Sequence, residues 1–184
     1  MRDKYTDKAK AAGLRARSAY KLMAINKKYS LIKPNDAVLD LGCFPGGWLI
    51  VATRKGASKV VGIDLQPIER IQGVTFIQGD VTKEETLGQI KDKFDVVLSD
   101  MAPKTSGNHS RDVGRSIALA EIAFNVAKRF LKPGGRFLVK VFQGAEYMEF
   151  VNKVRKSFSF FKTVKPEASK LKSREMYVLG IGFR

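Results

Sequence analysis

The sequence predicts an α/β fold with a mainly parallel seven-stranded sheet, an antiparallel hairpin at one edge and helices on both faces. Three observations carry this prediction. Short apolar runs alternate with amphipathic segments, which is typical of βαβ units. The first apolar run breaks into glycines, as a strand-to-helix turn does. The last two runs are separated by a loop too short for a helical crossover, so they should pair antiparallel.

Seven short apolar runs have the composition of strands, and the segments between them have the periodicity of helices. The expected strands are residues 37–41, 59–64, 74–78, 94–100, 136–142, 160–165 and 176–183. The expected helices cover residues 18 to about 32, 48–55, 82–90, 115–131 and 145–156. Ser18 and Thr82 are placed to cap the first and the third of these helices.

The stretch from Val38 to Trp48 is a short apolar strand followed by a glycine-rich turn. Gly42, Gly46 and Gly47 allow a tight turn and leave no side chain between the backbone and a ligand. The spacing does not match the G-x-G-x-x-G of dinucleotide-binding folds, and the G-K-[ST] of a phosphate loop is missing. The turn therefore indicates either a nucleoside-type ligand or a structural strand-to-helix connection.

Four carboxylates stand at or just after the ends of the first four strands: Asp40, Asp64, Asp80 and Asp100. Ligands of open parallel sheets lie outside the carboxyl ends of the strands, so we expect these side chains to line one rim. Asp64 lies 22 residues beyond Gly42, close to the spacing of ~20 at which an acid reaches ribose hydroxyls. A single Asp is often only a turn former, but four in matching positions favour a ligand site.

Lys140 interrupts the apolar run of residues 137–142, where a strand covered on both faces should be continuously apolar. Burying an unpaired ammonium is costly, so a carboxylate on a neighbouring strand should meet it, and Asp100 is the obvious candidate. The alternative is a lysine that reaches water from the strand end.

The chain of 184 residues is long enough for one domain with a sizeable core. We divide it into a basic amino-terminal flank of residues 1–36, a cofactor-binding core of residues 37–152 and a basic carboxyl-terminal flank of residues 153–184. No apolar run approaches the ~20 residues that cross a bilayer, and no apolar signal segment begins the chain, so we expect a cytoplasmic protein without a membrane partner. The single cysteine and the single histidine, Cys43 and His109, supply neither a disulfide nor a zinc site, and we expect no metal.

The formal net charge of +16 is concentrated at the two ends of the chain. The amino-terminal flank holds ten Lys or Arg and three Asp, and the carboxyl-terminal flank holds nine Lys or Arg and two Glu. The core between them is nearly neutral. Two basic flanks beside a neutral core favour a polyanionic partner such as RNA, and a merely solubilising surface is the alternative.

Several motifs together resemble those of the FtsJ (RrmJ) family of S-adenosylmethionine-dependent RNA ribose 2′-O-methyltransferases. They are Arg-Ser-Ala-Tyr-Lys-Leu at 17–22, Asp-Leu-Gly at 40–42, Pro-Gly-Gly-Trp at 45–48, Ser-Asp-Met-Ala-Pro at 99–103, Lys140 and Ser-Arg-Glu at 173–175. The resemblance spans nearly the whole chain and implies the Rossmann-like methyltransferase fold. Cys43 and Phe44 depart from the family, in which alanines are usual, and this departure affects the fit around the methionine part of the cofactor.

The resemblance implies a catalytic tetrad, in which Lys140 accepts the proton of the ribose hydroxyl. The tetrad residues are Lys21, Asp100, Lys140 and Glu175. It also implies S-adenosylmethionine as cofactor, S-adenosylhomocysteine as product and no metal. The implied cofactor-binding residues are Asp40, Gly42, Pro45, Gly46, Gly47, Trp48, Asp64, Asp80 and Asp100, with Asp64 at the ribose, Asp80 at the adenine amino group and Asp100 near the methionine ammonium.

The leading hypothesis is a monomeric enzyme that methylates a ribose 2′-hydroxyl of structured RNA. The expected target is a uridine of large-subunit (23S-type) rRNA, free or in the large ribosomal subunit. A methyltransferase of the tRNA anticodon loop is an alternative, because the short form and the basic amino terminus resemble both subfamilies. A cap-type mRNA enzyme is disfavoured because no extra cap-binding segment is present. The alternative from another class is a non-catalytic RNA-binding or ribosome-assembly protein, against which the complete tetrad argues.

Overall fold

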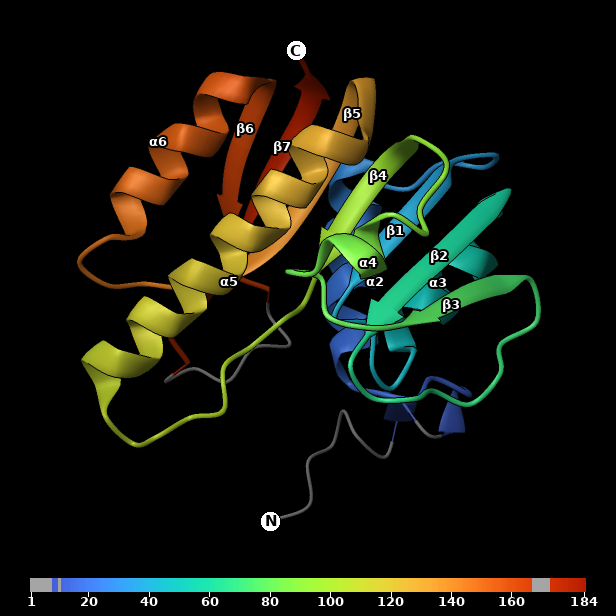
Figure 1. Cartoon of the computed structure of the whole chain (residues 1–184), viewed down its shortest axis with the longest axis horizontal. Helices are drawn as coiled ribbons and strands as arrows, with labels where there is room; N and C mark the ends of the chain where they lie inside the picture. The colour runs from blue at the N-terminus through green and yellow to red at the C-terminus, as the bar shows by residue number, and fades with distance from the viewer. Residues whose placement is uncertain (1–7, 10, 167–172) are drawn as a thin grey trace.

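The computed structural model describes residues 8–9, 11–166 and 173–184, and it has the predicted α/β architecture (Figure 1). One seven-stranded sheet has the strand order β3-β2-β1-β4-β5-β7-β6. Its strands are β1 Ala37–Leu41, β2 Lys59–Asp64, β3 Val74–Gln78, β4 Phe94–Ser99, β5 Leu131–Phe142, β6 Phe158–Val164 and β7 Glu175–Phe183. The helices are α2 Ser18–Tyr29, α3 Gly47–Arg54, α4 Glu84–Leu87, α5 His109–Phe130 and α6 Tyr147–Ser157.

The predicted edge hairpin is confirmed. β7 runs antiparallel to both β5 and β6, whereas β1, β2, β3, β4 and β5 pair parallel with one another. β7 lies between β5 and β6 rather than at the edge itself. This position puts Tyr177 directly across from Lys140 in the β5–β7 register, so the two side chains share one face of the sheet.

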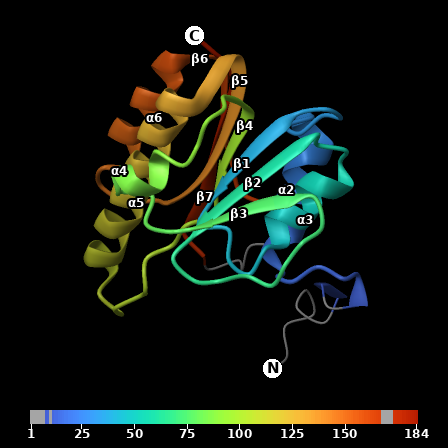
Figure 2. The ribbon, with the colours of Figure 1, turned by 45° about the vertical axis from the view of Figure 1, so that its right-hand side comes forward.

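Two helical layers cover the sheet, as Figure 2 shows, with α2 and α3 on one face and α5 and α6 on the other. Successive residues of β1 point to opposite layers. Val38 belongs to the apolar cluster under α2 and α3, and Leu39 belongs to the cluster under α5 and α6. The near-continuous apolar strands that sequence analysis identified are therefore buried on both faces.

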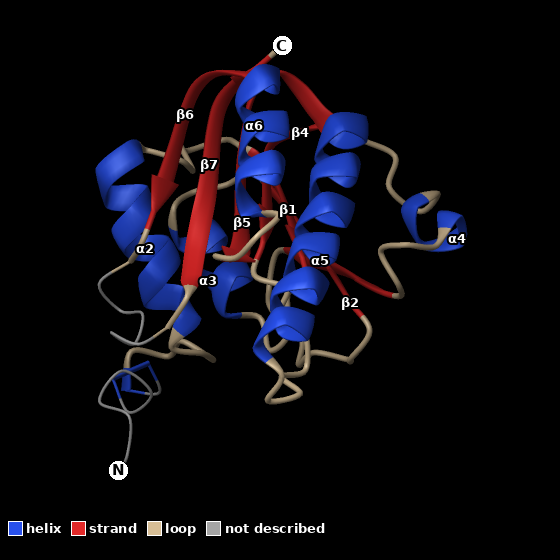
Figure 3. Cartoon of the chain, turned by 90° about the vertical axis from the view of Figure 1, so that its left-hand side faces the viewer, coloured by secondary structure: helices blue, strands red, loops and turns tan. Residues whose placement is uncertain are grey.

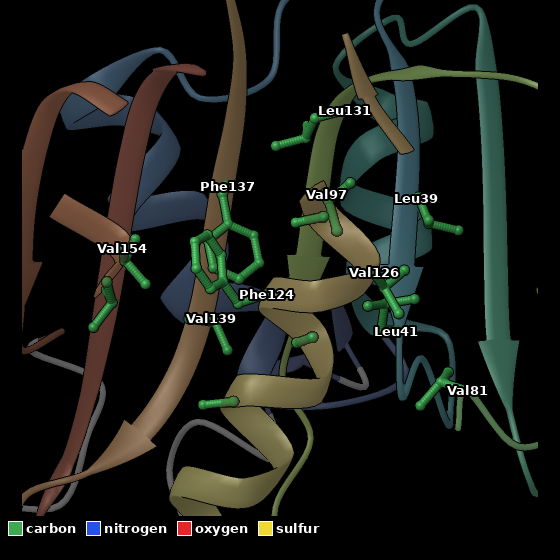
Figure 4. Packing of buried hydrophobic residues seen from close by; sticks show 14 of the residues in the cluster. Leu39, Leu41, Val81, Val97, Phe124, Val126, Leu131, Phe137, Val139 and Val154 are labelled. Carbon is green, nitrogen blue, oxygen red and sulfur yellow. The ribbon is translucent and has the colours of Figure 1, made fainter. Parts of the chain in front are cut away.

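The core under α5 and α6 is built from aliphatic side chains of the strands and a group of aromatic rings (Figure 4). Phe137 of β5 lies 5.8 Å from the ring of Phe124 of α5 and 6.2 Å from the ring of Phe158 of β6. Figure 3 shows α5 and α6 lying side by side over this half of the sheet. The packing fixes the position of β5, the strand that carries Lys140.

Two expected helix caps do not form, and one helix begins well before its expected start. Ser18 does not cap α2; it is the first helical residue, and the preceding residue makes no side-chain cap. Thr82 does not cap α4, because both its backbone N–H and its hydroxyl donate to the Asp80 carboxylate. α5 begins at His109, six residues before the expected start, because the Asn108 side chain accepts a hydrogen bond from the backbone N–H of Arg111.

Part of each basic flank lies outside the described residues, including Arg2, Lys4, Lys10, Lys170 and Lys172. Within the described ranges, none of the helices has the length and apolar character that crossing a membrane requires.

Candidate active site

The glycine-rich turn between β1 and α3 forms one wall of the site. Gly42 has a φ of +72°, and a Cβ at this position would lie 2.3 Å from Cγ of Met101. Gly46 has a φ of +103°. Both positions require the left-handed backbone that glycine adopts without strain. The turn therefore approaches the loop after β4 more closely than any side chain would allow.

A pocket of about 410 Å³ opens between the loops that follow β1, β2, β3 and β4. Its volume is in the range of small-molecule sites. The lining residues are Gly42, Phe44, Ile63, Asp64, Leu65, Gln66, Gly79, Asp80, Val81, Thr82, Asp100, Met101, Ala102, Lys104 and Leu119. Three of the four strand-end carboxylates are therefore brought together at the carboxyl end of the parallel strands, as expected.

Asp64 and Asp80 are oriented by the turns that follow their strands. The two carboxylate oxygens of Asp64 accept hydrogen bonds from the backbone N–H groups of Phe44 and Gln66, at 2.9 and 2.8 Å. Asp80 accepts from the backbone N–H and the hydroxyl of Thr82, and the hydrogen bond from this backbone N–H is the main reason that the pKa of Asp80 is lowered. Both side chains are thus held as acceptors on the pocket wall.

Asp40 is placed differently from the other three carboxylates. It is 1% exposed, it does not line the pocket, and neither of its carboxylate oxygens has a hydrogen-bond partner among the described residues. Burial raises the pKa of Asp40 well above its usual value, and the charges of Asp100 and Asp64 raise it further. The expectation that all four acids line the rim is wrong for Asp40, because Asp40 pairs with Gly62 of β2 and so lies two register positions further inside the sheet than Asp64.

The groups around this pocket fit S-adenosylmethionine. Asp64 and Asp80 offer oxygens to hydroxyl and amino donors, and Asp100 offers a carboxylate to an ammonium group. Asp40 is close enough to Asp64 and Asp100 for their charges to act on it, and its oxygens have no hydrogen-bond partner among the described residues, so a cation nearby would stabilise its charged form. Phe44 and Leu65 are large exposed apolar side chains at the same pocket and can cover a flat base.

The remaining residues of the turn face the amino-terminal segment. The carbonyl of Pro45 accepts a hydrogen bond from Arg15 at 3.3 Å, and a Cβ on Gly47 would lie 3.3 Å from Cβ of Ala16. Trp48 is buried and donates its indole N–H to the carbonyl of Ser18 at 2.9 Å. The contact of Pro45, Gly46, Gly47 and Trp48 with the cofactor stays a prediction.

The four tetrad residues form two ion pairs beside this pocket. Lys140 on β5 lies 3.0 Å from Oδ1 of Asp100 and donates to the Asp100 carbonyl at 2.6 Å. The expected contact between these two residues is therefore present. Lys21 on α2 lies 2.5 Å from Oε1 of Glu175 at the start of β7. All four side chains are less than one-fifth exposed, so both pairs are shielded from water.

Asp100 belongs to both parts of the site. It lines the cofactor pocket and also contacts Lys140. A group held by Asp100 in the pocket and a group approaching Lys140 would therefore meet at one carboxylate.

Tyr177 links the two ion pairs, and sequence analysis did not identify it. Its hydroxyl donates to Oδ1 of Asp100 at 2.6 Å, and Nζ of Lys21 lies 5.9 Å from the centre of its ring. Burial raises the pKa of Tyr177 well above its usual value, and the charges of Asp100 and Glu175 add to this effect, so the phenol stays protonated. The alternation of Glu175 and Tyr177 along one strand face was the available signal.

Arg15 is a second residue that sequence analysis missed. Its guanidinium donates to the carbonyls of Pro45, Glu69 and Arg70, at 3.3, 2.7 and 3.2 Å. These bonds tie the segment that leads into α2 to the glycine-rich turn and to the loop after β2. The position of Lys21 is thereby connected to the wall of the cofactor pocket.

A search of the described residues finds no group of three His, Cys, Asp or Glu side chains arranged to hold a metal ion.

Comparisons with known proteins give one consistent result. Residues 14–183 match the family model of the FtsJ-like methyltransferases. The chain is 50% identical to the ribosomal RNA large subunit methyltransferase E of Methanocella arvoryzae, over 99% of this chain and 73% of that protein. It is 48% identical to the protein of the same name from Archaeoglobus fulgidus, over 99% of this chain and 96% of that protein.

A solved structure shows the same fold. The crystal structure of a ribosomal RNA methyltransferase from Plasmodium falciparum superposes with a TM-score of 0.81 at 30% identity, covering 92% of this chain and 98% of that one. The family match over most of the chain, the relatives at about half identity and this superposition agree with the geometry of the pocket and of the paired lysines. The chain therefore belongs to the FtsJ-like methyltransferase family.

Proposed function

We propose that this methyltransferase transfers a methyl group from S-adenosylmethionine to the 2′-hydroxyl of a uridine ribose in large-subunit rRNA. Membership of the family implies the use of S-adenosylmethionine. The names of the relatives support a ribosomal substrate over the tRNA anticodon loop. The formal charge of +16 supports an RNA partner.

The observation that carries the proposal is the position of Lys140. Lys140 is 7% exposed, and its amine is held against a carboxylate that also lines the cofactor pocket. A lysine in this position has no role in packing the apolar core. It is placed to take a proton from a hydroxyl that approaches the pocket from the side of β5.

The chemistry divides between the donor and the protein. S-adenosylmethionine, when bound, supplies a methyl group on a sulfonium that is already a good leaving group, so the protein has to remove only the proton of the ribose hydroxyl. The uncharged amine of Lys140, formed when the ammonium of the ion pair releases a proton to solvent, accepts this proton as the oxygen–methyl bond forms. The Asp100 carboxylate, 3.0 Å away, then stabilises the resulting ammonium. Because the hydroxyl must be held in line with the methyl group, positioning contributes a further part of the acceleration.

Lys21 and Glu175 have a supporting role in this proposal. Their 2.5 Å ion pair joins α2 to β7 next to Tyr177, whose hydroxyl contacts Asp100. The pair keeps a second positive charge close to the reacting centre without competing for Asp100. We assign these two residues to the positioning of the substrate ribose and Lys140 to proton transfer.

The role of Lys140 is tested by substitution. Lys140→Ala should lose methyl transfer by at least the ~10²–10⁴-fold that general-base catalysis provides. Lys140→Arg should not restore activity, because a guanidinium stays protonated and cannot accept the proton. The assay is single-turnover methyl transfer to rRNA at saturating RNA and cofactor, measured across pH.

Lys132 provides a matched control on the same strand. It also pairs with an aspartate, Asp95, at 2.9 Å, but it lies at the opposite end of β5. Lys132→Ala should leave the rate unchanged. Near-normal turnover by Lys140→Ala would refute the proposed base, and full activity of Lys140→Arg would show that the site requires positive charge rather than proton acceptance.

The substrate is tested separately. Mapping ribose 2′-O-methylation in all RNAs of a strain lacking this protein should reveal one missing methyl group, on a uridine of large-subunit rRNA. Loss of a methyl group from a tRNA anticodon loop instead would overturn the ribosomal assignment but leave the reaction in place. Unchanged methylation of every RNA would overturn both.

A further inference from the structure

A second hollow lies on the outer face of α2, away from the cofactor pocket. It has a volume of about 690 Å³ and runs from the first turn of α2 to the loop between α2 and β1 and the end of α3. We call it the basic groove. Its lining includes Tyr20, Met23 and Lys27 of α2, Lys33 and Pro34 of the loop, and Lys55 after α3. Figure 2 shows α2 and α3 together on this side of the sheet.

The charge of the basic groove is of one sign. Three lysines line it, Lys27, Lys33 and Lys55, and no Asp or Glu does. All three are exposed, and none of them forms an ion pair with another described residue. Elsewhere in the described chain, basic side chains are often neutralised by acids, in the pairs Lys59–Asp92, Arg129–Glu84, Lys132–Asp95 and Lys153–Glu121.

The floor of the groove is partly apolar. Met23 is 39% exposed, and Ala24 and Pro34 line the hollow beside it. Tyr20, in the first turn of α2, adds an aromatic side chain to the lining. A concave surface that combines apolar and aromatic groups with lysines suits nucleotides, because the bases and riboses contact the apolar parts while the phosphates meet the ammonium groups.

The groove and the tetrad share helix α2. Tyr20 lines the groove, and the next residue, Lys21, pairs with Glu175 beside Lys140. α2 has 12 residues and is therefore about 18 Å long, which places Lys33 and Lys55 beyond its far end. An RNA strand in the groove would run from the reacting centre toward the far end of α2, with several of its phosphates alongside the helix.

We propose that the basic groove binds the segment of the RNA substrate that adjoins the methylated nucleotide. This inference rests on the RNA substrate of the proposed function and adds where the strand runs on the protein. The single sign of the charge commits the site to RNA rather than to a protein, whose surface would carry both signs. The groove contributes to RNA affinity and register and takes no part in proton transfer or in cofactor binding.

The test is the triple variant Lys27→Ala, Lys33→Ala, Lys55→Ala of the full chain. A matched control removes three exposed lysines outside the groove, Lys91 and Lys93 in the loop before β4 and Lys156 of α6. The probe is a fluorescent fragment of large-subunit rRNA, whose affinity is measured between 50 and 300 mM salt. Each lost phosphate contact on a single strand lowers the log–log salt slope by about 0.7, so the groove variant should lose about 2. The control should keep the wild-type slope.

Kinetics supply the second reading. The groove variant should keep its kcat at saturating RNA and its S-adenosylmethionine affinity, while its KM for RNA rises at least tenfold. If the groove variant has the wild-type salt slope and the wild-type KM for RNA, while the wild type methylates normally, the proposal for the groove is overturned and the proposed function stands. A wild type that binds this RNA but methylates none would count against the function alone. If the groove variant binds the RNA fragment normally but no longer binds the large ribosomal subunit, the groove contacts a protein and the proposal is overturned.

Discussion

Asp40→Asn is the most informative single substitution for the core of the site. Asp40 is 1% exposed, and within the part of the chain that the structure describes neither of its carboxylate oxygens has a hydrogen-bond partner. Leaving such a polar group unsatisfied costs about 1–3 kcal/mol, and the cost is larger when the group is charged. The wild type therefore holds this side chain at the expense of its own stability, and we expect the reason to be the cationic cofactor.

The pH dependence of stability follows from the raised pKa of Asp40. In the unfolded chain the group titrates near its ordinary value of about 3.9, whereas burial raises its pKa in the folded protein. The folded state thus binds the proton more tightly, and the contribution of Asp40 to stability is lost as the pH rises through the window between the two values. Asn does not titrate. Relative to the wild type, Asp40→Asn should gain unfolding free energy as the pH is raised from about 4 to 8.

The assay is urea unfolding of the cofactor-free protein at several pH values, with calorimetry of S-adenosylmethionine binding at neutral pH. The diagnostic quantity is how the difference in unfolding free energy between Asp40→Asn and the wild type changes with pH, because the buried Asn amide adds a cost that does not depend on pH. Cofactor affinity should fall roughly tenfold, or about 1.4 kcal/mol. Asp92→Asn, at an exposed carboxylate paired with Lys59, is the control and should change neither quantity appreciably. A stability difference that is flat with pH would refute the argument about burial, and unchanged cofactor affinity would refute the role at the pocket.

Three further predictions follow from the geometry of the site. Gly42→Ala should destabilise the fold and weaken cofactor binding, because a Cβ would lie 2.3 Å from Met101. The control Gly73→Ala, with a φ of +76° and no atom within 4 Å, should show only the backbone strain of about 1–2 kcal/mol. Urea unfolding of both variants separates the clash from the strain, and equal losses of unfolding free energy would contradict the close approach. Asp64→Ala should lower S-adenosylmethionine affinity at least tenfold in calorimetry, because it removes the acceptor on the pocket wall and leaves the N–H of Phe44 without that acceptor. Unchanged binding by the folded variant would show that Asp64 is not part of the site. Tyr177→Phe should cost about 1 kcal/mol in unfolding free energy and slow methyl transfer by several-fold without changing cofactor affinity. The reason is that Asp100 loses its 2.6 Å donor while the ring packing against Trp48 persists. A wild-type rate would show that this hydrogen bond does not support the site.

The sequence by itself determined the architecture. Strand composition, glycine turns and the short last loop depend on local backbone preferences and on burial of both sheet faces, and these were enough to predict seven strands and an antiparallel hairpin. The pairing of Lys140 with Asp100 was also predictable, because a lysine inside an apolar strand requires a nearby carboxylate. Helix starts were predicted less well, since the Thr82 hydroxyl binds Asp80 instead of capping α4 and Ser18 falls inside α2.

Only the tertiary structure decided which groups meet across long separations in the chain. Tyr177 reaches Asp100 because β7 inserts antiparallel beside β5 and sets it opposite Lys140, a register that no local pattern specifies. Asp40 and Asp64 look equivalent in sequence, yet Asp40 is buried with no hydrogen-bond partner among the described residues, and Asp64 lines the pocket. The β1–β2 register explains the difference, because Asp40 pairs with Gly62 and therefore lies two positions further inside the sheet than Asp64. The basic groove likewise exists only because α2 and the end of α3 bring lysines distant in sequence to one hollow.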